Sequence, residues 1–470
     1  MIKPSPRRFL NVFLLALLNL SVMTSLRNLP IVSEYGFASI TLYVCVAIAF
    51  LFPSALVSAE LATGWNRPGG VYVWVREAFG PKWGFFAIWM QWIHNVTWFP
   101  AILSFSATTL AYLINPALAS NSTYLISFIL VGFWSVTFFN LFGLKTSSWF
   151  SALGVIAGTI IPGILLLCLG IAWYVGGHPI QIPLTASALI PPLHNIQNLV
   201  FIAGLFLAFG GLEVSAAHAK EVQNPQRDYP RSILLAAVVS LLIYALGALS
   251  IAIIIPRADI SLVAGLMEAF QRFLPTFGLE WALGILALMI VYGAIGELNA
   301  WIIGPVRGLH ATSKHGDLPP VFQKLNKRGI PANLLFFQGA IVTVATFAFH
   351  FMPSASSAFW ILSAMSAQLY LVMYFLMFLA AIKLRYSHPQ VIRAYRIPYH
   401  MPGIWIVAGF GAISSLFGFC LGFVPPGQLD TGSLLFYECF LGIGIAAMSF
   451  IPVLIYKYRN PSWRPHNYEP

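Results

Sequence analysis

Long hydrophobic runs separated by short polar segments dominate the pattern along this chain. A helix needs about 20 mostly apolar residues to cross the hydrocarbon core of a bilayer, and apolar runs of that order are typical of transmembrane helices. The pattern predicts an all-α integral membrane protein with twelve transmembrane helices. We place these helices at 9–34, 37–63, 83–113, 123–143, 147–175, 198–222, 231–256, 279–313, 332–352, 356–384, 403–424 and 432–457.

Two of the runs are interrupted by residues that weaken a helix. The first carries a polar patch closed by Pro30, and the sixth carries Gly210, Gly211 and Glu213. Interrupted segments at corresponding positions of two halves are typical of inverted repeats that share a site near the membrane midplane. We therefore expect a five-plus-five inverted repeat with discontinuous helices 1 and 6, followed by two extra helices. The three parts would cover about 9–175, 198–384 and 403–457.

The composition leaves little room for a soluble domain. Of the 470 residues, 59% are hydrophobic and only 8% are charged, against about 25% charged residues in an average soluble protein. We expect one membrane domain over residues 1–470. The four cysteines, which fall within apolar segments, are expected to be buried thiols rather than disulfides or metal ligands. They are Cys45, Cys168, Cys420 and Cys439.

The basic residues alternate from loop to loop. All but three of the 25 lysines and arginines lie at one side of the predicted helices, the exceptions being Arg27, Arg257 and Arg272. The positive-inside rule then predicts a multi-pass protein of the plasma (inner) membrane with both termini in the cytoplasm. Because the net charge of +11 is spread over short loops, it indicates topology in a lipid bilayer and no nucleic-acid partner.

Acidic residues inside the predicted helices are the candidates for chemistry, since a carboxylate in hydrocarbon marks a substrate, ion or proton site. Glu213 lies at the break of the sixth helix, and Glu297 lies four residues before Trp301 on one helical face. Both acids are candidates for proton coupling. His94 is expected to be a packed, hydrogen-bonded histidine, and Glu60 is expected to join Arg67 and Arg76 in a cytoplasmic charge cluster.

Arg27 leaves two alternatives open. A guanidinium at the break of the first helix would bind a substrate carboxylate through two hydrogen bonds. Alternatively, Arg27 would extend to the membrane surface and pair with Glu34.

Several motifs resemble those of the amino acid–polyamine–organocation superfamily. The chain has Ala59-Glu60-Leu61, then Pro68-Gly69-Gly70 with Tyr72, and then Ala78-Phe79-Gly80-Pro81. Asn224-Pro225 followed by Arg227-Asp228-Tyr229-Pro230, and Glu297, Trp301 and Gly304-Pro305 in the eighth run, are similar to the glutamate:GABA antiporter branch.

The resemblance implies an inverted-repeat transporter that exchanges amino acids or their decarboxylation products and has no cofactor. It also implies that Tyr370 and Tyr374, and the face of Glu297 and Trp301, border the substrate path. Tyrosines that members of the acid-resistance type carry in the first break are replaced here by Leu26, Arg27, Asn28 and Leu29. With about a dozen residues after Tyr458, no C-terminal plug of that type is expected.

The leading prediction is an antiporter of zwitterionic or acidic amino acids that works by alternating access, with protons as a possible coupled ion. The alternatives are an exchanger of cationic amino acids or polyamines, and a nutrient sensor or channel on the same scaffold. Since no catalytic motif or metal-ligand spacing is present, we expect no enzyme and no metal. The oligomeric state is open. The predicted substrate-binding residues are Ser21, Met23, Thr24, Ser25, Arg27, Phe206, Phe209, Gly210, Gly211, Glu213, Glu297, Trp301, Tyr370 and Tyr374.

Overall fold

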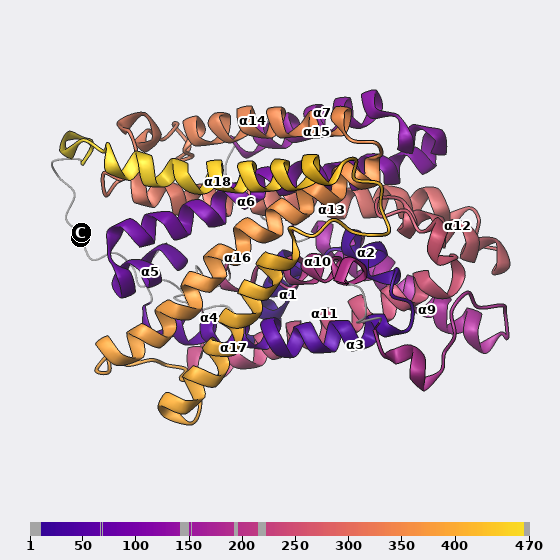
Figure 1. The fold of residues 1–470 in the computed structure, drawn as a ribbon, viewed down its shortest axis with the longest axis horizontal. Helices are drawn as coiled ribbons and strands as arrows, with labels where there is room; N and C mark the ends of the chain where they lie inside the picture. Colours follow the sequence, from indigo (N-terminus) through magenta and orange to yellow (C-terminus); the bar gives the residue numbers. More distant parts are fainter. Residues whose placement is uncertain are drawn as a thin grey trace.

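The protein is a bundle of long helices, most of which run side by side along its longest axis (Figure 1). The computed structural model describes residues 11–65, 67, 69–141, 150–151, 153–191, 196–214 and 222–464. Within these residues, eleven helices are long and apolar enough to cross a bilayer, and a bent helix pair brings the number to twelve. The prediction of an all-α membrane protein is confirmed.

The spans follow the predicted hydrophobic runs closely. In chain order they are α1 (Val12–Met23) with η1 (Leu26–Asn28) and α2 (Leu29–Ser33), α3 (Ala38–Val46) with the π-helical turn η2 (Ala47–Leu51) and α4 (Phe52–Gly64), α6 (Pro81–Ile114), α7 (Ser122–Asn140), the π-helical turn η4 (Ile156–Ile160) with α9 (Ile161–Val175), α10 (Ile202–Ala208), α11 (Pro225–Ile254), α13 (Ala282–Ser313), α14 (Ala332–Thr346) with α15 (Ala348–Phe351), α16 (Ala355–Ser387), α17 (His400–Leu421) and α18 (Leu434–Lys457).

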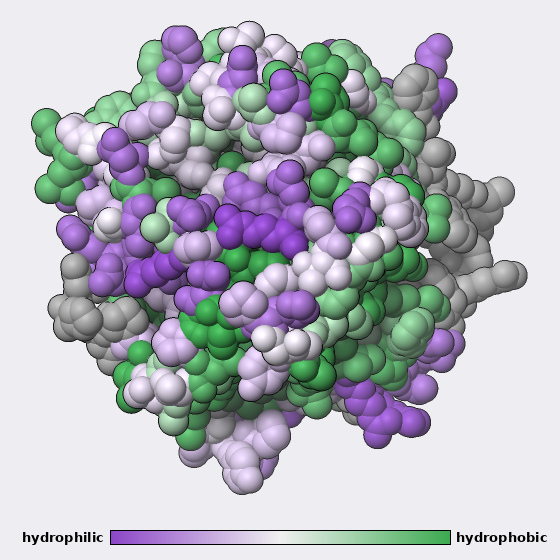
Figure 2. Space-filling view, turned by 90° about the vertical axis from the view of Figure 1, so that its right-hand side faces the viewer, coloured by the Kyte–Doolittle hydropathy of each residue, from purple (hydrophilic) through white to green (hydrophobic). Residues whose placement is uncertain are grey.

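Shorter helices lie between the spans. Two of them, α5 (Val71–Phe79) and α12 (Gly265–Thr276), place apolar residues on one face and polar residues on the other, as expected at a bundle end. Figure 2 views the end that carries α12, where hydrophilic side chains cross the middle of the surface. The remaining short turns are η3 (Pro116–Ser120), η5 (Ala186–Leu189), η6 (Ile196–Leu199), η8 (Arg257–Asp259), η9 (Pro320–Gln323) and η10 (Pro461–Trp463).

Both predicted breaks are present in the described residues. Span one bends by 45° between α1 and α2, because Thr24 and Ser25 adopt extended backbone angles. In span six, α10 ends at Ala208 and the chain unwinds through Gly211, whose φ of +118° favours glycine. The rest of the predicted sixth helix, beyond Val214, lies outside the described residues.

Span five and α13 cross at closely packed glycines. A Cβ added to Gly158 would lie 2.4 Å from the Cα of Gly293, and one added to Gly154 would lie 3.2 Å from the Cα of Gly296. Small residues four or three apart allow two helix backbones to approach closely in a membrane. This crossing fixes α13, and with it Glu297, against the first half of the chain.

Burial separates central from peripheral spans. In α6 and α16 most residues are buried, whereas α18 exposes most of its apolar side chains. The prediction of buried thiols is wrong, since all four cysteines are exposed on apolar helix surfaces. A lipid-facing surface is as apolar as a core, so hydropathy alone does not distinguish the two environments.

Candidate functional site

A small cavity lies where the two breaks face α6, α13 and α16. About 20 Å³ of it is open to the centre of a water molecule, which is room for one or two waters. An amino acid would therefore enter only after the surrounding helices move apart. The cavity is lined by Val22, Met23, Arg27, Asn28, His94, Asn95, Trp98, Leu207, Gly210, Glu297, Trp301 and Tyr370.

Arg27 is fully enclosed at this cavity. Its side chain is 1% exposed, and its guanidinium carbon lies 5.1 Å from the Trp98 ring centre and 5.8 Å from that of Phe359. Within the described residues, its Nε and Nη1 atoms have no hydrogen-bond partner. The predicted pairing with Glu34 is wrong, because Glu34 faces Arg257 at 3.6 Å.

Glu297 and Trp301 lie on the side of the cavity formed by α13. Glu297 is buried and close enough to Arg27 for the opposite charges to attract. The Trp301 Nε1–H donates to the Val22 carbonyl at 3.2 Å, at the break of span one. The two residues thus share one helical face, as predicted from their spacing.

Three further polar atoms at the cavity are buried without a partner in the part of the chain that the structure describes. They are Asn28 Oδ1, His94 Nε2 and Asn95 Oδ1. Only part of the expectation for His94 is met, since its Nδ1 lies 3.3 Å from the Ser366 hydroxyl while its Nε2 has no hydrogen-bond partner among the described residues. Sequence reasoning missed Asn28, Asn95 and Trp98, although the polar pair at 94–95 inside an apolar run was a visible signal.

Glu213 lies behind the cavity wall. It is 2% exposed, and the Tyr370 and Tyr374 hydroxyls each donate to one of its carboxylate oxygens. Gln91 Nε2 donates to the Oε1 atom at 2.9 Å. Glu213 is absent from the described cavity lining, and its hydrogen bond with Tyr370 connects it to a residue of that lining.

Tyr244, on α11, connects the two breaks and was not predicted. Its hydroxyl donates to the Met23 carbonyl at 2.6 Å and accepts from the Ser25 N–H at 2.9 Å. The same oxygen lies 3.4 Å from the carbonyl of Ala208, where α10 ends. Backbone groups freed by the unwinding are therefore satisfied without water, as a membrane interior requires.

The other predicted site residues lie around the cavity, and they are not among its described lining residues. The Ser21 hydroxyl donates to the Leu18 carbonyl of its own helix, and Thr24 bonds Ser240 at 2.7 Å. Phe206 packs on Phe50. Phe209 packs against the rings of Tyr43 and Tyr244. The Gly211 N–H donates to the Tyr374 hydroxyl at 2.8 Å, and the Ser25 N–H donates to the Tyr244 hydroxyl.

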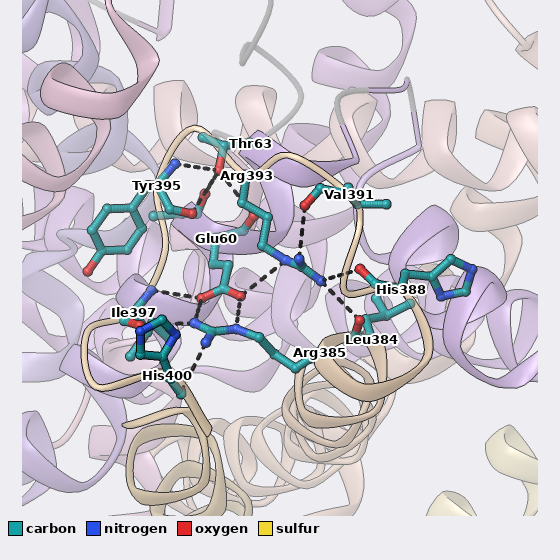
Figure 3. A network of polar contacts seen from close by, with 11 residues as sticks. Glu60, Thr63, Leu384, Arg385, His388, Val391, Arg393, Tyr395, Ile397 and His400 are labelled. Carbon is teal, nitrogen blue, oxygen red and sulfur yellow. Dashed lines mark hydrogen bonds and ion pairs between the residues drawn. The ribbon is translucent and has the colours of Figure 1, made fainter. Parts of the chain in front are cut away.

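A second polar cluster surrounds Glu60 at the ends of α4 and α16 (Figure 3). Arg385 Nε and Nη2 donate to the two Glu60 oxygens, both at 2.5 Å, and Arg393 Nε lies 3.3 Å from Oε1. The Ile397 N–H also donates to Oε2 at 2.8 Å. Glu60 does form a buried charge cluster, but the prediction of its partners is wrong.

The predicted partners of Glu60 lie elsewhere, since Arg67 faces Glu77 at 3.7 Å and Arg76 contacts His315. The distribution of charges along the loops did not reveal which loop folds back onto α4.

Comparisons with known proteins agree with this architecture. A family model described as "Amino acid permease" matches residues 9–445. The chain is 41% identical to an uncharacterized transporter of Legionella pneumophila, over 96% of this chain and 97% of the relative. It is 34% identical to a glutamate/gamma-aminobutyrate antiporter of Lactococcus lactis, over 87% and 82% of the two chains.

A probable agmatine/putrescine antiporter of Lactococcus lactis is 25% identical, over 78% of this chain and 77% of the relative. These relatives are transporters, in agreement with the many apolar helices and the resemblance seen in the motifs. The chain belongs to the amino acid permease family and is a multi-pass membrane protein of that family.

Proposed function

We propose that this protein is an antiporter that exchanges zwitterionic or acidic amino acids, such as glutamate and γ-aminobutyrate, by alternating access. The observation that carries the proposal is the Arg27 guanidinium, which is buried at the cavity with two N–H groups unpaired among the described residues. The relatives named as glutamate/gamma-aminobutyrate antiporters support the same substrate class.

The energetics of Arg27 favour an anionic ligand. Burying a charge costs several kcal/mol, and Glu297 attracts the guanidinium without bonding its Nε and Nη1 atoms. A carboxylate that accepts two N–H bonds from the guanidinium would satisfy these atoms and offset part of the cost. Glu297, which lines the same cavity, would attract the ammonium group of such a substrate. The pair of charges thus matches a molecule that carries both signs.

Substrates with only positive charge fit this site less well. An agmatine or polyamine would place a cation beside Arg27 without offering it a carboxylate. The relative with an agmatine/putrescine name also shares less sequence with this chain than the glutamate/gamma-aminobutyrate antiporters do. We therefore favour carboxylate-bearing substrates over a cationic exchanger.

Transport would require the helices around the cavity to rearrange, since the cavity now has room only for molecules of the size of water. We infer that spans one to five and six to ten form two inverted repeats that move relative to each other. Glu213 and Glu297 are the candidates for proton coupling, because each is a buried carboxylate next to the breaks. The charge pattern supports a cytoplasmic position for both termini in the plasma membrane.

Counterflow in proteoliposomes tests the proposal. Vesicles loaded with glutamate, γ-aminobutyrate or glutamine should accelerate uptake of labelled glutamate, whereas putrescine-loaded vesicles should not. Acceleration by putrescine or agmatine alone would favour the cationic exchanger. Unitary currents without a counter-substrate would indicate a channel, and no uptake of any amino acid would contradict the proposal.

A further inference from the structure

His94 is held in one orientation at the cavity. Its ring stacks on Tyr370 with centroids 3.8 Å apart and planes 9° apart, and it forms a T-shaped pair with the Trp301 ring, with centroids 5.8 Å apart. Two neighbours on α16 and α13 therefore fix the plane of the imidazole. The Nε2 atom, which lacks a partner among the described residues, belongs to a side chain that lines the cavity.

The hydrogen-bond pattern assigns the tautomer of the neutral ring. The Ser366 hydroxyl lies 3.0 Å from the His94 carbonyl oxygen, which only accepts hydrogen bonds, so the serine donates its one hydrogen there. The same hydroxyl oxygen, 3.3 Å from Nδ1, is left to accept. Nδ1 therefore carries the proton, and Nε2 offers a lone pair to the cavity.

Asn95 adds a second acceptor beside this nitrogen. Its Nδ2 donates to the Gln91 carbonyl at 2.8 Å, which fixes the direction of the amide. The remaining Oδ1 atom is buried without a partner among the described residues. Both free atoms on this part of α6 are thus acceptors.

Among the described residues, free donors and free acceptors both lie at the cavity, and Asn28 Oδ1, next to Arg27 in the chain, is a third acceptor. Trp98, over which the Arg27 guanidinium lies, follows His94 by four residues, which is a rise of about 6 Å along a helix. The free groups of Arg27 are N–H donors, and those of His94 and Asn95 are acceptors. A ligand that satisfies these groups needs a carboxylate for Arg27 and an N–H-bearing cation for His94 and Asn95.

We propose that His94 is a specificity-determining residue whose Nε2 accepts a hydrogen bond from the ammonium group of the transported amino acid. The inference rests on the proposed function, and it goes further by naming the residue that distinguishes an amino acid from the same acid without its amine. Glu297 would attract the positive charge of the ammonium group, and His94 Nε2 would accept a hydrogen bond from it in a fixed direction.

Substrate competition in proteoliposomes tests this role. His94→Phe keeps an aromatic ring to stack on Tyr370 and removes both ring nitrogens. In the wild type, glutamate should compete with labelled glutamate far better than glutarate, which has the two carboxylates and no ammonium. In the variant the preference for glutamate should fall about tenfold or more, the expected effect of losing a hydrogen bond to a charged group.

The matched control is His178→Phe, because His178 also packs against an aromatic ring, that of Trp173, and is not among the described residues of the cavity lining. It should leave the preference unchanged. His94→Leu repeats the test if the phenylalanine variant is not recovered as monodisperse protein. His94→Gln, whose amide oxygen can accept, should keep part of the preference.

The outcomes separate the two proposals. An unchanged glutamate-to-glutarate preference in a folded His94→Phe protein overturns the role of His94 and leaves the proposed function intact. An equal loss of affinity for both compounds also overturns it, since that indicates a structural role. A wild type that exchanges no amino acid contradicts the proposed function itself.

Discussion

The Tyr370 hydroxyl donates a hydrogen bond to Oε1 of Glu213, while the ring of the same tyrosine forms part of the cavity wall. The acid next to the break of span six is therefore separated from the cavity by one side chain. Any movement of Tyr370 changes both the shape of the cavity and the hydrogen bonding of Glu213. A substrate that displaces Tyr370 on entering the cavity would therefore also change the hydrogen bonding of the Glu213 carboxylate.

Tyr370→Phe should weaken this connection. Loss of a hydrogen bond to a buried carboxylate is expected to cost about 1.5–3 kcal/mol of stability and to reduce exchange. Thermal unfolding of the purified protein and counterflow measure the two effects. Tyr124→Phe removes a neutral hydrogen bond to the Ala107 carbonyl, and neither residue is among the described residues of the cavity lining. This variant should leave exchange unchanged, and a reduction equal to that of Tyr370→Phe would contradict the account.

Gly210→Ala should displace the Tyr370 ring. An added Cβ would lie 2.5 Å from Tyr370 Cε1, closer than atoms can pack, so we expect a loss of about 1–3 kcal/mol in stability and slower exchange. Gly304→Ala is the control, since a Cβ added to this glycine of α13 would point into open space, with no atom from another part of the described chain within 4 Å. Equal exchange rates for the two variants would argue against close packing at the break.

Glu60→Gln should destabilise the protein strongly. The carboxylate is buried with Arg385 and Arg393, and removing one partner of a buried ion pair costs about 3–5 kcal/mol. The exposed pair Arg67–Glu77 provides the comparison, since Glu77→Gln should cost about 0–1 kcal/mol. Thermal unfolding of both variants tests the difference, and a Glu60→Gln protein as stable as the Glu77→Gln protein would contradict it.

His315, in the loop after α13, should make stability depend on pH. Burial, and then the positive charges of Arg76 and Arg464, lower the pKa of His315 from 6.5 to about 4. The unfolded chain binds this proton at a higher pH than the folded protein does. The contribution of neutral His315 to the stability of the folded protein is therefore fully present above about pH 6.5 and is lost as the pH falls toward about 4.

His315→Asn should accordingly lose less thermal stability than the wild type when the pH is lowered through this range. His350→Gln, at an exposed position of α15, should follow the wild type. If the thermal stability of the wild type and of His315→Asn fell equally as the pH was lowered, His315 would not take up a proton on unfolding, which would contradict the prediction.

The spans and their breaks could be predicted from the sequence, because a bilayer imposes strong rules on both. Long apolar runs are required to cross it, and Gly210 and Gly211 weaken a helix where lipid offers no hydrogen bonds. Arg27 was also identified, since a charged side chain beside a break is uncommon. Glu297 was identified as an acid inside an apolar run, and the resemblance of the eighth run implied that its face and Trp301 border the substrate path.

Tertiary contacts could not be predicted in the same way. Tyr244 connects both breaks from α11, and nothing in its local sequence distinguishes it from other membrane tyrosines. The screening of Glu213 by Tyr370 depends on how α16 packs against span six. Likewise, the partners of Glu60 come from the end of α16 and the loop after it, more than 300 residues away in the chain.

The role of Arg27 is the centre of the proposal, and competition by glutamate for labelled glutamate uptake tests it most directly. Arg27→Gln should weaken the apparent affinity about tenfold or more, whereas Arg257→Gln, at the exposed partner of Glu34, should behave as the wild type does. An Arg27→Gln protein that is folded and takes up glutamate with unchanged affinity would contradict a carboxylate site at this guanidinium.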